Sequence, residues 1–171
     1  MIILRTTDGV RYGIRQIRQE DRPYLVIGIQ ELSPITRYRR FLSARTTLTD
    51  SELDHLLSCD GWNHIAVVAA SVDEDGRELD GIGVARFHRD PNNPSVGEVA
   101  IVVIDAWQGK GIGFTLLQEL KRLCVNVGVE DWKATIMGEN EAAQALFAKV
   151  GETVLVEADE LHVTLHIEIG P

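Results

Sequence analysis

The segment from Gln108 to Gly113, Q-G-K-G-I-G, constrains the fold of this chain more than any other stretch. It follows an apolar run, Val99 to Ile104, and precedes a segment of helical periodicity that extends to about Val127. A glycine-rich turn between a strand and a helix N-terminus leaves backbone N–H groups unpaired, and the helix dipole favours negative charge there. The segment therefore predicts a strand, a phosphate-binding turn and a helix.

Three kinds of phosphate-binding turn compete for this segment. A Walker turn ends in Gly-Lys-Ser/Thr, whereas here Lys110 precedes Gly111 and no hydroxyl residue follows. A dinucleotide fingerprint reads G-x-G-x-x-G after a βαβ pattern, whereas this chain has G-x-G-x-G after a pattern of antiparallel hairpins. The third kind, Q/R-x-x-G-x-G/A, cradles the pyrophosphate of coenzyme A, and Gln108, Gly111 and Gly113 occupy its fixed positions.

Three segments resemble the GNAT family of acyl-CoA-dependent N-acetyltransferases. Residues 98–113 resemble the family's fourth strand and pyrophosphate turn, and residues 140–151, N-E-A-A-Q-A-L-F-A-K-V-G, resemble its following helix. Residues 32–41, L-S-P-I-T-R-Y-R-R-F, are similar to a signature of the GNAT domains of bacterial protein-lysine acetyltransferases. The resemblance implies an α+β fold in which a mixed, mostly antiparallel sheet of six to seven strands carries helices on both faces.

The expected order of elements agrees with that fold. Strands are expected at residues 12–17, 65–71, 79–88, 97–104, 132–137, 152–156 and 161–169. Helices are expected at residues 20–29, from Pro34 with Ser33 as cap, from a Thr49 or Asp50 cap to about Gly61, at 112–127 and at 140–150. We expect the whole chain, 1–171, to form a single domain.

Composition bears on the cellular location, the state of the cysteines and metal binding. No apolar stretch approaches the length of a membrane span, and charged residues interrupt the N-terminal segment, so we expect a cytoplasmic protein without membrane contact. The two cysteines, Cys59 and Cys124, fall in helical apolar patterns and are expected to be buried free thiols. No cysteine or histidine spacing indicates zinc, so no metal is expected.

The charge is negative overall and unevenly distributed. A net charge of -9 argues against nucleic acid as a partner. The first 50 residues hold nine Arg against five Asp or Glu, so the excess of acidic residues lies entirely in the remainder. Those acids either form ordinary solvated faces or attract a cationic substrate, such as a lysine-bearing protein or a polyamine.

Glu98 is the candidate general base. A free lysine has a pKa of about 10.4, so at pH 7 only about one molecule in 2,500 carries the neutral amine that can attack a thioester. A positioned carboxylate can take up the proton. Glu98 interrupts an otherwise apolar strand, and in the resemblance it matches the glutamate that serves as base in bacterial lysine acetyltransferases. The alternative is a solvated glutamate at a strand end, beside Gly97.

The resemblance implies acetyl-CoA as cosubstrate and gives ten positions that would contact it. They are Ile101, Val102, Val103, Gln108, Gly109, Lys110, Gly111, Ile112, Gly113 and Asn140. Residues 101–103 would use their backbone, so their β-branched side chains are equally compatible with a plain buried strand. Lys110 is either a contact to the pyrophosphate or a solvated lysine. Asn140 is either a contact to the pantetheine arm or a plain helix N-cap.

Two departures from the family pattern bear on catalysis and packing. Phe147 stands where many members carry a tyrosine that protonates the departing thiolate, so water is expected to serve instead. Glu152 follows Gly151 where a phenylalanine is usual, which we interpret as a local packing change.

Other chemistry-bearing residues leave alternatives open. Residues 37–40, R-Y-R-R, are either a packed helix face with arginines paired to acids, or a wall of the acceptor site or a contact to the coenzyme A 3′-phosphate. His88, His162 and His166 are expected on solvated strand faces. Cys124 lies on the packed side of its helix with no histidine near it in sequence, so no covalent acyl-enzyme is expected.

Together these features predict an N-acetyltransferase that moves an acetyl group from acetyl-CoA to a primary amine by direct attack in a ternary complex. The favoured acceptor is a protein lysine. One alternative is a small amine, such as a polyamine or an aminoglycoside, and another is a coenzyme A-binding sensor without catalysis. A homodimer remains open, because dimers are frequent among the proteins that this chain resembles.

Overall fold

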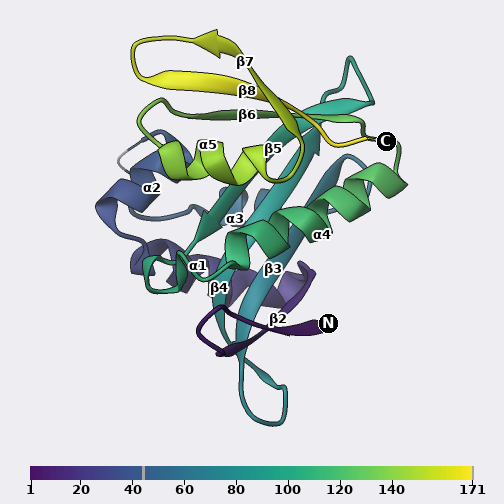
Figure 1. Cartoon of the computed structure of the whole chain (residues 1–171). Helices are drawn as coiled ribbons and strands as arrows, with labels where there is room; N and C mark the ends of the chain where they lie inside the picture. Colours follow the sequence, from purple (N-terminus) through teal and green to yellow (C-terminus); the bar gives the residue numbers. More distant parts are fainter. Residues whose placement is uncertain (44, 171) are drawn as a thin grey trace.

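A computed structural model describes residues 1–43 and 45–170 as an open sheet with helices on both faces (Figure 1). The strands are β1 (Ile2–Arg5), β2 (Arg11–Gln16), β3 (His64–Val72), β4 (Glu78–Arg89), β5 (Val96–Val103), β6 (Asp131–Met137), β7 (Glu152–Ala158) and β8 (His162–Glu168). The helices are α1 (Arg22–Glu31), α2 (Pro34–Phe41), α3 (Asp50–Leu57), α4 (Ile112–Asn126) and α5 (Glu141–Ala148), with 3-10 turns η1 (Gln19–Asp21) and η2 (Asp105–Trp107).

The strand order in the described sheet is β1-β2-β3-β4-β5-β6-β8-β7. Neighbouring strands run antiparallel except β5 and β6, which are parallel. This confirms the expected α+β fold with a mixed, mostly antiparallel sheet. The described sheet has eight strands rather than six or seven, because Ile2–Arg5 pairs with β2 in a hairpin. β1 is a short edge strand whose Ile2 and Ile3 stay about half exposed, so it lacks the in-out alternation that marks longer strands.

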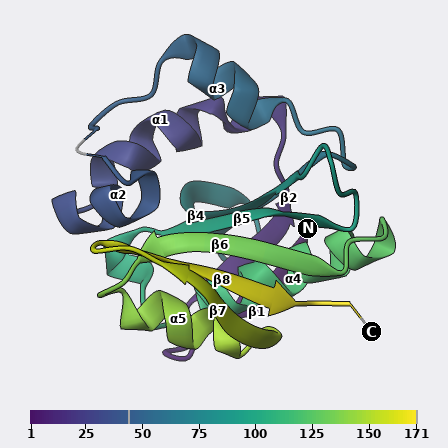
Figure 2. The ribbon, with the colours of Figure 1, turned by 90° about the horizontal axis from the view of Figure 1, so that it is seen from above.

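The helices cover the two faces of the sheet unequally. Figure 2 shows α1, α2 and α3 over one face and α4 and α5 over the other. The apolar stripe of α4 packs on β3, β4 and β5, with Ile112, Leu116 and Leu120 at most 1% exposed. Leu123 and Val127, at the far end of the expected stripe, pack against this core while partly exposed. The helical periodicity in the sequence therefore predicted the buried face correctly.

Helix starts agree with the expected caps. The Ser33 hydroxyl accepts a hydrogen bond from the Thr36 amide at 3.2 Å, and Thr49 forms a capping box with Glu52. α3 ends at Leu57, earlier than expected, because the following residues form a turn around Asp60. The Asp60 carboxylate accepts hydrogen bonds from the backbone amides of residues 62–64, and these hold its pKa well below the ordinary value.

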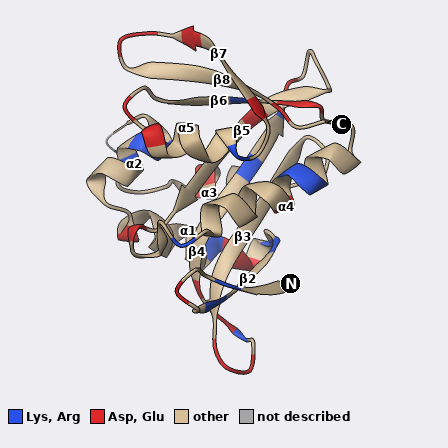
Figure 3. Ribbon diagram, viewed as in Figure 1, with Lys and Arg blue, Asp and Glu red and all other residues tan. Residues whose placement is uncertain are grey.

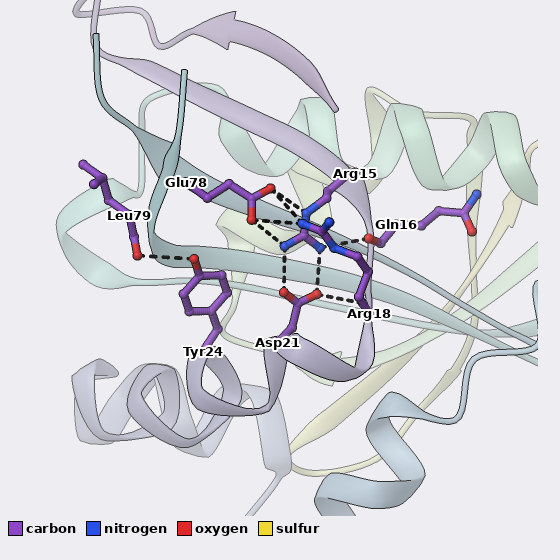
Figure 4. Close-up of polar contacts among 7 residues, drawn as sticks. All are labelled: Arg15, Gln16, Arg18, Asp21, Tyr24, Glu78 and Leu79. Atoms are coloured by element: carbon purple, nitrogen blue, oxygen red, sulfur yellow. Dashed lines mark hydrogen bonds and ion pairs between the residues drawn. The ribbon is translucent and has the colours of Figure 1, made fainter. Parts of the chain in front are cut away.

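A buried ion network fastens the start of α1 to the sheet (Figure 4). Arg15 on β2 donates two hydrogen bonds to Asp21, both 2.7 Å, and further bonds to Glu78 on β4. The Asp21 side chain is only 2% exposed. Burial alone would raise the Asp21 pKa, but the hydrogen bonds from Arg15 and from the Arg18 amide outweigh it and hold the pKa below its ordinary value.

Replacing Asp21 by asparagine is expected to lower the free energy of unfolding by about 2 kcal/mol at pH 7, because charged hydrogen bonds in a buried site are lost. Since the pKa of Asp21 is lowered by folding, its contribution is complete above the unfolded pKa of about 3.9 and disappears as pH falls through the folded value. Urea titrations at neutral and strongly acidic pH measure this difference. The exposed Asp54, paired with Arg22, is the control, and an equal loss in Asp54→Asn would contradict the prediction.

Both cysteines are free thiols, as expected, and they differ in surroundings. Cys124 is fully buried in α4, and burial raises the pKa of its thiol to about 12. Cys59 departs from the expectation of a buried helical residue, because it follows the end of α3 and is half-buried, and burial also raises its pKa. Neither thiol is therefore prepared to act as a nucleophile at neutral pH.

Acidic side chains are spread over separate turns. Figure 3 shows Asp and Glu in the turn between β3 and β4 and again around β7, at opposite ends of the molecule. This distribution agrees with the interpretation of the acidic excess as solvated surface. Within residues 1–43 and 45–170, none of the helices combines the length and the apolar character that crossing a membrane requires.

Candidate active site

The sheet is split between β5 and β6. The two strands pair only through residues 96–98 and 131–133, whereas β5 continues to pair with β4 as far as Val103. The Ile104 amide donates to the Ile82 carbonyl on β4, and backbone groups alternate in direction along an antiparallel strand. The backbone N–H and C=O of Ile101 and Val103 therefore face the gap, while those of Val102 face β4.

A cleft of about 910 Å³ occupies this gap. Its walls come from β5, the glycine-rich turn, the start of α4, one side of α5 and the end of α2. The lining includes Thr36, Arg39, Arg40, Val99, Ala100, Ile101, Val102, Val103, Trp107, Gln108, Gly109, Gly111, Gly113, Phe114, Thr135, Ile136, Asn140, Ala143, Leu146 and Phe147. The cleft thus brings together eight of the ten residues expected to contact acetyl-CoA, and Lys110 and Ile112 lie within the same turn.

The glycine-rich turn presents a row of free amides. Gly109 and Gly111 have φ angles of +71° and +88°, which side chains rarely tolerate, and Gly111 is the N-cap of α4. The N–H groups of residues 109–113 donate no hydrogen bond to any described residue. Unpaired amides at a helix N-terminus form an anion-binding site, so the turn is built to hold a phosphate or diphosphate.

Gly113 lets α4 approach α5 closely. A Cβ atom at Gly113 would lie 3.2 Å from Leu146 Cδ2, so a side chain there would require Leu146 to shift by a few tenths of an ångström. The turn and the helix that begins after Asn140 are thereby held on opposite sides of one cleft. The resemblance to the GNAT family implied that both motifs contact the same cofactor.

Gln108 and Lys110 fasten the turn to its surroundings. Gln108 Nε2 donates to the Val103 carbonyl at 2.9 Å, which ties the turn to the end of β5. Lys110 Nζ lies 3.0 Å from an Asp8 carboxylate oxygen and 5.3 Å from the centre of the Trp107 ring. Lys110 is therefore paired rather than simply solvated. This ion pair is partly exposed, so it contributes little to stability.

Asn140 caps α5, as one of its two interpretations predicted. Its side-chain oxygen accepts a hydrogen bond from the Ala143 amide at 3.3 Å. Its NH₂ group donates to no acceptor in the described part of the chain and lies at the wall of the cleft. The cap and a contact to a bound ligand are thus compatible, since they use different atoms.

Glu98 lies at the apex of the gap. It is the last residue of β5 that pairs with β6, opposite Lys133, and it faces His88 on β4. Its side chain is exposed, on the sheet face that carries α2 and α3, whereas the neighbouring Val99 is buried under α4. The carboxylate makes no hydrogen bond or ion pair with residues 1–43 and 45–170, so it is free to accept a proton from a bound group.

His88 departs from the expectation of a solvated strand face. Its ring stacks on His64 at 3.9 Å and on His55 at 5.2 Å between centroids, because α3 places His55 over the two strands. Burial, with Arg86 as the next contribution, lowers the pKa of His88 to about 4, so the ring is neutral at pH 7. His162 and His166 lie on the exposed face of β8, each beside an aspartate.

Phe147 is part of the hydrophobic core. Its side chain is 1% exposed, and its ring closes the cleft from the α5 side. The position where many family members have a tyrosine therefore offers no hydroxyl to a departing thiolate. Thr36 and Thr135 are hydroxyl residues that line the same cleft, although Thr36 already donates to Asp105 at 2.9 Å.

The arginine-rich helix α2 combines both interpretations left open by the sequence. Arg39 forms an ion pair with Glu139 at 3.5 Å, in the turn that precedes α5. Arg37 donates to the Ile29 carbonyl and so supports packing. Arg39 and Arg40 line the cleft as well, so this helix contributes to the wall of the site.

The split sheet and the amide-lined turn define a protein that grips an elongated, diphosphate-bearing ligand. A family model described as "Acetyltransferase (GNAT) family" matches residues 29–151, more than half of the chain. The chain belongs to this family.

The chain is also similar to individual acetyltransferases in sequence or in fold. Acetyltransferase Pat of Mycolicibacterium smegmatis is 30% identical over 170 residues, which cover 99% of this chain and 49% of that protein. The chain thus spans about half the length of this relative. The GNAT domain of S. lividans PAT superimposes with a TM-score of 0.85 at 20% identity, covering 98% of this chain and 96% of that domain. The Salmonella typhimurium protein yncA, solved with its cofactor acetyl-CoA, gives 0.71 at 19% identity over 92% and 94%.

Proposed function

We propose that residues 1–171 form a single GNAT domain that transfers an acetyl group from acetyl-CoA to a primary amine, with a protein lysine as the acceptor. The main support for this proposal is the split between β5 and β6, which has unpaired amides at one end and the unpaired carboxylate of Glu98 at the other. One site thus offers a grip for a diphosphate and a base for an amine.

Acetyl-CoA supplies the activated acetyl group, and ten residues would hold it. The amides of residues 109–113 bind the diphosphate, with the ammonium of Lys110 adding charge. Gln108 keeps the turn against β5 through its bond to Val103. The gap-facing backbone of Ile101 and Val103 pairs with the amides of the pantetheine arm, as an additional strand would.

The other two contacts complete the cleft. Val102 contributes its side chain, because its backbone pairs with Val84 on β4. The free NH₂ group of Asn140 donates to the pantetheine arm from the opposite wall. The support for acetyl-CoA, rather than another phosphorylated ligand, is the family membership together with the bound cofactor named for yncA.

Glu98 takes a proton from the acceptor ammonium, directly or through one water. The neutral amine attacks the acetyl carbonyl, a new C–N bond forms, and the C–S bond breaks with the electron pair leaving on sulfur. Water protonates the thiolate, since Phe147 has no proton to give. The thiol of Cys124 is buried and its pKa is raised, so it does not form an acyl-enzyme. The amine therefore attacks acetyl-CoA directly.

The exposure of Glu98 supports a macromolecular acceptor. The sheet face around it continues over β6 and β8 through Lys133 and Thr135, which are both exposed. A lysine side chain extending from another folded protein reaches such an open face without a dedicated pocket. This feature favours protein lysine over a small amine.

Release of coenzyme A thiol, measured with a panel of acceptors, tests the proposal. Lysine-bearing peptides are expected to give acetyl-CoA-dependent thiol release, and the same peptides with norleucine in place of lysine are the matched control. Preferential turnover of spermidine or an aminoglycoside would contradict the protein acceptor. Calorimetric binding of acetyl-CoA without turnover on any amine would instead indicate a coenzyme A sensor.

A further inference from the structure

A second cavity lies on the sheet face that carries Glu98, enclosed by α1, α2 and α3. Its volume is about 70 Å³, and its lining is largely apolar. Representative lining residues are Leu25, Ile29, Phe41, Leu56, Val84 and Ile104. Arg40 from α2 and Arg86 from β4 supply the charge among the described lining residues. Arg86 is buried and Arg40 is half-buried, and charges in such places are normally paired, so the two guanidinium groups require an explanation.

Arg86 is almost completely buried and only partly satisfied. Its side chain is 3% exposed, its Nη1 donates to the Leu56 carbonyl at 3.0 Å, and the same atom lies 2.9 Å from His64 Nε2. Its Nε has no hydrogen-bond partner among the residues that the structure describes. Arg40 makes no hydrogen bond or ion pair with any described residue. Guanidinium N–H groups at the cavity wall therefore lack hydrogen-bond acceptors.

The surroundings of the two arginines are cationic or neutral. The charged neighbours that act on the Arg40 guanidinium are Arg86 and Arg45. The titratable neighbour that acts on Arg86 is Cys59. The neighbouring rings of His55, His64 and His88 form the stack described above. Glu98, although it faces His88 in register, forms no ion pair with either arginine. In the described part of the chain, no carboxylate balances this charge.

Both arginines nevertheless stay charged at neutral pH. Burial, with the charge of Arg86 as the second cause, lowers the pKa of Arg40 to about 10. Burial lowers the pKa of Arg86 to about 10 as well. Burial also lowers the pKa of His64 to about 3, so its ring is neutral at pH 7 and adds no further positive charge. The cavity wall thus carries two positive charges, and a bound carboxylate would balance one of them.

We propose that this cavity binds a small carboxylate with a short apolar chain. The carboxylate lies between the guanidinium groups of Arg40 and Arg86, whose planar forks match its two oxygens, and the chain packs against the apolar lining. Arg40 and Val102 line both this cavity and the cofactor cleft, so the ligand lies next to the acceptor side of the gap. This site goes beyond the proposed acetyl transfer, since its occupation requires no acetyl-CoA.

Calorimetry with sodium propionate and the full chain, without acetyl-CoA, measures the binding directly. Propionate is expected to bind saturably to the wild type and at least about tenfold more weakly to Arg40→Met, because a charged hydrogen-bonding partner is removed. Arg37→Met is the matched control, since Arg37 lies on the same helix outside the cavity lining, and it should keep the wild-type affinity. Equal propionate affinity in Arg40→Met and the wild type would overturn the proposal.

Thermal unfolding supplies a second readout that a misfolded variant could not imitate. Without propionate, Arg40→Met is expected to unfold at a higher temperature than the wild type, because a half-buried cation without a counter-ion is removed from beside Arg86. Added propionate should raise the unfolding temperature of the wild type and leave that of Arg40→Met unchanged. Arg40→Lys, which keeps the charge and loses the planar fork, should retain part of the response. A lower unfolding temperature for ligand-free Arg40→Met, with propionate still protective, would overturn the proposal.

Three further probes identify the chemistry. Propylamine and, at equal ionic strength, chloride are expected to bind far more weakly than propionate, and equal binding of either would overturn the assignment of a carboxylate. β-Alanine carries both a carboxylate and a primary amine. If it binds and is acetylated, the carboxylate belongs to the acceptor; if it binds without being acetylated, the carboxylate belongs to a separate small acid. Both results support the site, and neither depends on whether a protein lysine is acetylated.

Discussion

Replacing Glu98 by glutamine is expected to lower turnover with a lysine acceptor at least about tenfold, since general bases typically contribute about 10²–10⁴-fold. Glutamine has nearly the same shape and cannot take up the ammonium proton. Acetyl-CoA affinity should stay nearly unchanged, because Glu98 lies at the apex of the gap, ten residues before the turn that we propose as the diphosphate site. Steady-state thiol release and calorimetry with acetyl-CoA measure the two quantities separately.

The pH dependence distinguishes a missing base from a structural defect. As pH rises toward the lysine pKa of about 10.4, more of the acceptor is already neutral, so the difference between Glu98→Gln and the wild type should shrink. Glu168→Gln is the control, because Glu168 is an exposed strand glutamate in register opposite Asp131. Wild-type turnover in Glu98→Gln, or an equal loss in Glu168→Gln, would remove Glu98 from the role of base.

The strand, turn and helix around residues 99–127 could be predicted because their signals are local. The apolar run, the glycines and the spacing of Leu116 and Leu120 each act within a few residues, and the structure agrees with all three. Asn140 as a helix cap follows from an intrinsic preference of its side chain, and the hydrogen bond to Ala143 confirms it.

The arginine cavity could not be predicted, because its members meet only through tertiary packing. Arg40 on α2 and Arg86 on β4 come from different layers of the molecule, and α3 supplies His55 from a third segment. One signal was available: Arg86 interrupts an expected strand between Ala85 and Phe87, both fully buried in the structure. An arginine inside a buried strand indicates a special environment, but the pattern does not name the partner.

Contacts of flexible side chains could not be predicted from the sequence either. The sequence left Lys110 open between a phosphate contact and a solvated lysine, and it did not indicate that Gln108 bonds to Val103 and Lys110 to Asp8. Asp8 lies about a hundred residues earlier, in the hairpin that begins with the unexpected strand β1. Missing that strand therefore also hid the partner of Lys110.

Replacing Gly111 by aspartate is expected to weaken acetyl-CoA binding by at least about a hundredfold. A carboxylate at this N-cap would lie among the amides of residues 109–113, and like charges brought together cost several kcal/mol, with about 1.4 kcal/mol for each factor of ten. The added side chain has room, since its Cβ would be 3.8 Å from the nearest atom, Thr7 Cγ2. Calorimetry with acetyl-CoA and coenzyme A measures the loss.

Two variants separate the charge from the backbone strain. Gly111→Asn imposes nearly the same shape at a φ of +88° without the charge, so it should lose much less affinity than Gly111→Asp. Gly128→Asp introduces the same side chain at a φ of +76° beyond the other end of α4, with open space around its Cβ, and should bind acetyl-CoA normally. Because the proposed grip consists of backbone amides, unchanged binding in Gly111→Asp would mean that the diphosphate lies elsewhere and that the gap beside β5 has another ligand.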